Sequence, residues 1–61
     1  MNLKERVQQL DASDVASLLG YKLDKLGNYG EMRQLANEWL IEKIESGDID
    51  EIELIIIESA N

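Results

Sequence analysis

The stretch YGEMRQLANEWLIEKIES, residues 29–46, decides the fold. Its apolar residues recur at the spacing of a helix, three or four positions apart. They form one broad face, which consists of Met32, Leu35, Ala36, Trp39, Leu40 and Ile44. Gly47 follows, a residue typical of helix ends, and Asn28 with Glu31 resembles a capping box at the start. The pattern predicts a helix over about residues 29–46, with Trp39 as an anchor of the core.

The segments before it also have helical spacing. Leu3, Val7 and Leu10 lie on one stripe and predict a first helix over residues 3–10. Either Asp11 or Ser13 can cap a second helix, which Gly20 would end. The apolar face of that second helix consists of Val15, Leu18 and Leu19. We therefore predict an all-α fold, a small bundle of three to four short helices in a single domain spanning residues 1–61.

The last segment, residues 48–60, admits two interpretations. One helical stripe consists of Ile49, Ile52, Ile55, Ile56 and Ala60, and acidic residues at the start suit a helix N-terminus. The isoleucines within 52–57 favour a strand on propensity, but no other segment reads as its pairing partner. We favour the helix. Leu54 and Ile57 then fall outside the stripe, which predicts an apolar interface for a second copy or a partner; the alternative is a helix buried on most sides.

Composition excludes several functions. A chain of 61 residues has a small core, and the absence of cysteine and histidine removes disulfides, thiol catalysis and the commonest metal ligand. No serine has a histidine partner, and GDIDE (residues 47–51) lacks the pattern of a calcium loop, so we expect neither an enzyme nor a metal or cofactor. The longest apolar run, residues 54–57, is too short to cross a bilayer. We expect a cytoplasmic protein without a membrane partner.

The net charge of −7 arises entirely in residues 35–61, where eight acidic side chains face Lys43 alone. The acidic residues predicted to bind a partner are Glu38, Glu42, Glu45, Asp48, Asp50 and Glu51. Carboxylates held on a rigid helix can imitate the phosphates of a nucleic acid and so occupy a basic cleft. The alternative is a solvated helix face that keeps a small protein soluble.

A third pattern lies in residues 12–29. Ala16 and Gly20 are four positions apart, and the apolar residues around them are Val15, Leu19, Tyr21 and Leu26. This segment resembles the first helix and turn of the helix-turn-helix DNA-binding family. The resemblance implies a dimeric DNA-binding regulator whose DNA-contacting residues would be Lys22, Lys25 and Arg33. The chain departs from the family at Gly27, Asn28 and Gly30, which are poor residues for a recognition helix, and an ordinary corner between two helices is the alternative.

These patterns favour a small acidic protein-interaction module that acts by stoichiometric binding. Its specific version is an inhibitor or regulator of a basic, nucleic-acid-handling protein, by nucleic-acid mimicry. We expect a protein partner and a homodimer, and no direct binding of nucleic acid, which the negative charge repels. The alternatives are the helix-turn-helix regulator and an accessory structural subunit of a larger assembly.

Overall fold

Helices account for most of the chain that the structure describes. The computed structural model describes residues 2–20, 27 and 30–60. The helices are α1 (Leu3–Gln8), α2 (Ala12–Leu19), α3 (Glu31–Glu45) and α4 (Glu51–Ala60). The prediction of a small all-α bundle is confirmed, and within residues 48–60 the helix is correct and the strand is not.

The helix ends follow from local hydrogen bonds and backbone conformation. The Asn2 side-chain oxygen accepts a hydrogen bond from the Glu5 amide at 2.9 Å, which starts α1. Gly20, with φ of 77°, ends α2 in the left-handed conformation that favours glycine. Helix α3 begins at Glu31 with Gly30 at the cap position, later than the sequence predicted. Glu31 is thus the first helical residue instead of the third of a capping box, and Asn28 lies outside the described residues.

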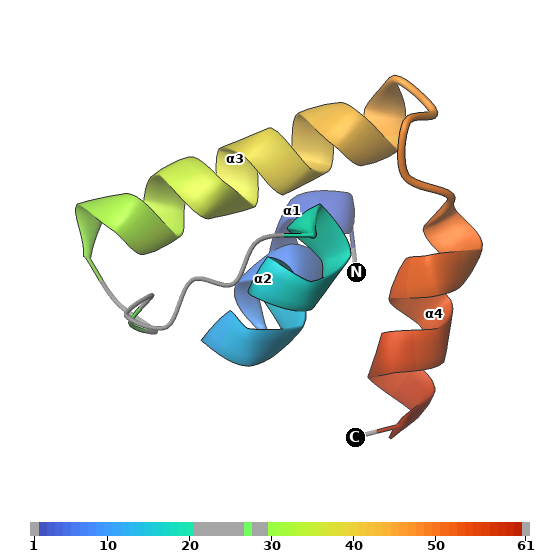
Figure 1. Cartoon of the computed structure of the whole chain (residues 1–61), viewed down its shortest axis with the longest axis horizontal. Coiled ribbons are helices and arrows are strands. Elements are labelled where there is room, and N and C mark those ends of the chain that lie inside the picture. Colours follow the sequence, from blue (N-terminus) through green and yellow to red (C-terminus); the bar gives the residue numbers. More distant parts are fainter. Residues whose placement is uncertain (1, 21–26, 28–29, 61) are drawn as a thin grey trace.

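Helix α3 lies across α1 and α2, and α4 turns back to pack against α2 (Figure 1). Each helix places one large side chain fully inside the core. These four residues are Val7, Val15, Leu40 and Leu54. Leu10, Ala36 and Ile49 complete the buried cluster. Because all four helices share this one cluster, the orientation of each helix depends on the other three.

The apolar face predicted for α3 is only partly buried. Ala36 and Leu40 lie in the core and Ile44 packs against it, whereas Trp39 is 43% exposed. Met32 and Leu35 are 64% and 59% exposed. The prediction that Trp39 anchors the core is therefore wrong. The six residues span about 180° of the helix, and the short helices α1 and α2 cover only part of that arc.

Helix α4 turns the opposite face inward from the one that the sequence predicted. Leu54 is fully buried and Ile57 packs against the core, so the predicted apolar interface at these residues is wrong. The outward side chains are Ile52, Ile55 and Ile56, with exposed fractions of 59%, 48% and 62%.

The reason for this orientation is an ion-pair cluster on α1. Arg6 Nη1 donates to Glu51 at 2.8 Å, and Arg6 Nε and Nη2 donate to the two carboxylate oxygens of Glu58 at 3.2 and 2.6 Å. At three- and four-residue spacing, Glu51 and Glu58 share one face of α4 with Leu54. By holding both carboxylates, Arg6 turns that face toward α1 and α2.

Candidate protein-interaction surface

One edge of α3 carries exposed carboxylates. Glu38, Glu42 and Glu45 lie with Glu31 within an arc of about 60°, and all four side chains are exposed. Within the described ranges the ion pairs belong to Arg6, so these four carboxylates have no counter-charge from that part of the chain. We call these four residues the acidic edge. Asp48, in the turn after α3, is also exposed and continues the negative field.

An exposed apolar stripe lies beside the acidic edge. It consists of Met32, Leu35 and Trp39, and we call it the α3 stripe. In helical projection Leu35 is only about 20° from Glu42. On its other side Lys43 places its ammonium 5.6 Å from the centroid of the Trp39 ring, within the range of a cation–π interaction. The α3 stripe therefore has an acidic border on one side and a single lysine on the other.

The exposure of these side chains is costly for an isolated small protein. Burying a large apolar side chain completely is worth about 1.5–3 kcal/mol, so three side chains left roughly half exposed forgo about 2–5 kcal/mol. The isoleucines on α4 forgo a similar amount. Exposed apolar surface next to polar residues is typical of protein-binding sites. The sequence analysis missed this surface because it assigned both sets of residues to the core.

Two of the predicted acidic binding residues have structural roles. Asp50 Oδ1 accepts a hydrogen bond from the Ile52 amide at 3.0 Å and so caps the start of α4. Glu51 forms an ion pair with Arg6. Both side chains remain exposed, but their charges are already engaged. The carboxylates that are free to attract a partner are therefore those of the acidic edge and Asp48.

Arg33 is buried and does not face a surface where DNA would bind. It is only 4% exposed, and its Nη2 donates to the carbonyl oxygens of Val7 at 3.0 Å and Leu10 at 2.7 Å. Its Nε donates to Asn37 Oδ1 at 2.7 Å. Burial lowers the pKa of Arg33, and the nearby charge of Asp11 partly opposes that shift. Arg33 binds the end of α1, so its prediction as a DNA contact is wrong; Lys22 and Lys25 lie outside the described residues.

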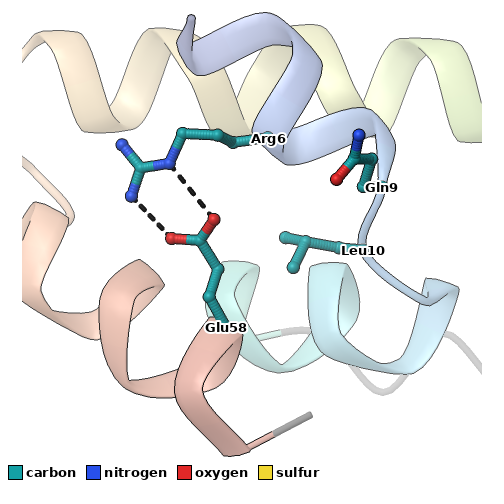
Figure 2. Close-up of a pocket in the computed structure, with 4 residues that line it drawn as sticks. All are labelled: Arg6, Gln9, Leu10 and Glu58. Carbon is teal, nitrogen blue, oxygen red and sulfur yellow. Dashed lines mark hydrogen bonds and ion pairs between the residues drawn. The ribbon is translucent and has the colours of Figure 1, made fainter. Parts of the chain in front are cut away.

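The hollow beside Arg6 is part of the fold and not a ligand site. Its volume is about 250 Å³, and its lining is Arg6, Gln9, Leu10 and Glu58 (Figure 2). Arg6 and Glu58 point toward each other across it from α1 and α4. A second hollow of about 280 Å³ lies between α1 and α3, lined by Lys4, Gln8, Gln34, Asn37, Glu38 and Ile41. Both are smaller than the ~300–1,000 Å³ typical of small-molecule sites.

The Arg6–Glu58 pair predicts a specific dependence of stability on pH. The pKa of Glu58 lies below its ordinary value of 4.5, because its carboxylate accepts hydrogen bonds from Arg6. A carboxylate with a depressed folded pKa stabilises the fold above its unfolded pKa and loses that effect as pH falls through the folded pKa. We expect Glu58→Gln to be less stable than wild type at pH 7, with the gap closing as the pH falls below 4.5.

Urea unfolding of wild type and Glu58→Gln at a series of pH values from 7 down to about 2.5 measures this gap. Glu53→Gln is the matched control, because Glu53 lies on the same helix, is exposed and has no ion pair among the described residues. A Glu58→Gln gap that stayed constant to the acid end of the series would contradict the role assigned to Arg6.

Comparison of the chain with protein-family models, with curated proteins and with solved structures finds no match. Within residues 2–20, 27 and 30–60, no group of three or more acidic residues is arranged to hold a metal ion. No helix in the same ranges is both long enough and apolar enough to span a membrane. The argument for function therefore depends on the surface of α3 and α4.

Proposed function

We propose that this chain is a small acidic interaction module that acts by stoichiometric binding to a basic protein. The observation that carries the proposal is the position of the α3 stripe directly beside the acidic edge. Apolar contact supplies affinity in protein interfaces, while complementary charge supplies orientation and fast association. One rigid helix presents both.

The charge density of α3 indicates what such a partner needs besides positive charge. Glu31 and Glu45 are separated by about 21 Å along the helix, so the four glutamates supply one charge per ~5 Å. Duplex DNA carries one per ~1.7 Å. The acidic edge is thus about three times sparser than the polymer it would imitate. A nucleic-acid-handling protein is a suitable target if its basic cleft also offers an apolar surface for the α3 stripe.

Charge reversal on α3 tests this function. We expect Glu38→Lys/Glu42→Lys/Glu45→Lys to weaken partner binding about 10- to 100-fold, because three surface charge pairs at ~0.5–1 kcal/mol each are lost. The measurement is affinity capture from a native lysate, with and without nuclease, eluted with increasing salt. Circular dichroism of the variant controls for folding.

Each result of the capture has a defined meaning. A protein retained after nuclease treatment, eluted by moderate salt and lost from the variant, supports the proposal. A partner that the variant binds unchanged, without salt dependence, would contradict it, as would the absence of any protein partner. DNA that is retained until nuclease is added would instead favour the helix-turn-helix alternative.

A further inference from the structure

We infer that the α3 stripe docks a basic amphipathic helix of the partner, one whose apolar stripe is bordered by lysine or arginine along one side only. The inference depends on the proposed function and specifies the partner's chemistry. It follows from three features of α3: the spacing of its exposed apolar residues, the one-sided placement of its charge, and the exposure of Met32 and Leu35.

The spacing suits helix-on-helix docking. Met32, Leu35 and Trp39 stand at positions i, i+3 and i+7, which is the pattern by which one helix presents anchors to another. They extend along about 10 Å of the helix, enough for two turns of a partner helix. Their exposed fractions of 64%, 59% and 43% leave apolar surface available for contact.

The charges define which side of the partner must be basic. Glu31, Glu38 and Glu42 follow one side of the α3 stripe, and within the described part of the chain no cation neutralises them. The opposite side has Lys43 and then the core. A docked helix therefore gains charge pairs only along the glutamate side. Lysines on its other side would approach Lys43 and be repelled.

The same charges argue against a second copy of the chain at this place. A second α3 brings the same glutamates, and Lys43 is its single basic residue apart from the buried Arg33. Self-association is less opposed on the outer face of α4, where Ile52, Ile55 and Ile56 are exposed. Two of the carboxylates beside that face, those of Glu51 and Glu58, are already paired with Arg6. Variants on α3 and on α4 therefore distinguish the two kinds of partner.

A synthetic peptide provides the probe. It has about 14 residues, long enough to form a helix on binding, and consists of a leucine stripe with lysines along one side. Trp39 is the only tryptophan of the chain, so its emission reports burial of the α3 stripe without added labels. We expect a saturable blue shift at one peptide per chain, weakened by salt. The same peptide with glutamate in place of lysine is expected to give no shift.

Two matched pairs of variants locate the site. Leu35→Gln is expected to weaken binding about tenfold, as the loss of one half-exposed apolar anchor implies, whereas Ile56→Gln, equally exposed but on α4, is expected to change it less than about twofold. Glu38→Gln/Glu42→Gln and Glu5→Gln/Glu53→Gln both change the net charge from −7 to −5, since each double variant removes two negative charges. Only the first of these double variants is expected to weaken binding.

Equal weakening by both double variants would overturn the inference, because net charge alone would then explain the binding. Loss of binding in Ile56→Gln but not in Leu35→Gln would also overturn it and would place the partner on α4. If the lysine peptide gives no shift while the lysate partner is still lost on charge reversal of α3, the proposed function stands and this inference fails. If no partner is captured either, both fail.

Discussion

Leu54→Ala is expected to lower the free energy of unfolding by about 2–5 kcal/mol. Leu54 is fully buried and lies in the one cluster to which all four helices contribute, so its truncation leaves a cavity that no single helix can close. A chain of this size has a total stability of only about 3–9 kcal/mol. The variant should therefore be partly unfolded at room temperature or melt well below wild type.

The control is Ile56→Ala on the same helix. Ile56 is 62% exposed, and its truncation is expected to change stability by no more than about 0.5 kcal/mol. Urea unfolding followed by circular dichroism at 222 nm measures both variants. If Ile56→Ala cost as much as Leu54→Ala, α4 would face inward with the isoleucine stripe that the sequence pattern predicted.

Arg33→Ala is expected to destabilise the fold by about 2–4 kcal/mol, because it removes charged hydrogen-bond donors from buried acceptors. Without Arg33, the carbonyl oxygens of Val7 and Leu10 lose its Nη2 donor. The C-terminal end of α1 also loses a favourable positive charge. At about 4–8 °C per kcal/mol for a small domain, the melting temperature should fall by more than 8 °C.

Lys43→Ala is the matched control for Arg33→Ala. It removes one positive charge from the same helix but only a solvent-accessible contact with Trp39, so we expect a loss of less than about 1 kcal/mol. Thermal unfolding at neutral pH compares the two variants. Wild-type stability of Arg33→Ala would contradict the role of Arg33 as the residue that binds the end of α1.

Helical periodicity was sufficient to predict the helices but not their orientation. The ends at Gly20 and near Gly47 were predicted correctly, because both glycines adopt the left-handed conformation, with φ of 77° and 87°. The helix over residues 51–60 was also correct, for the reason given from sequence: no other segment reads as a strand to pair with it.

The inward position of Arg33 had a sequence signal that was not used. On the helical wheel Arg33 falls between Leu40 and Ile44, within the arc that the structure buries. A basic residue in that arc needs buried acceptors, and the end of a short neighbouring helix provides carbonyl oxygens. The sequence analysis instead grouped it with Lys22 and Lys25, by nearness in the chain.

The amino-acid sequence by itself determined the class of fold, the division into helices and the confinement of the negative charge to the second half of the chain. The tertiary structure decided which faces are buried. In α4 apolar residues occur on every side, so periodicity cannot choose a face, and Arg6 on α1 makes the choice by binding Glu51 and Glu58. In α3 the apolar arc is wider than the short helices α1 and α2 can cover, which leaves the α3 stripe exposed beside the acidic edge.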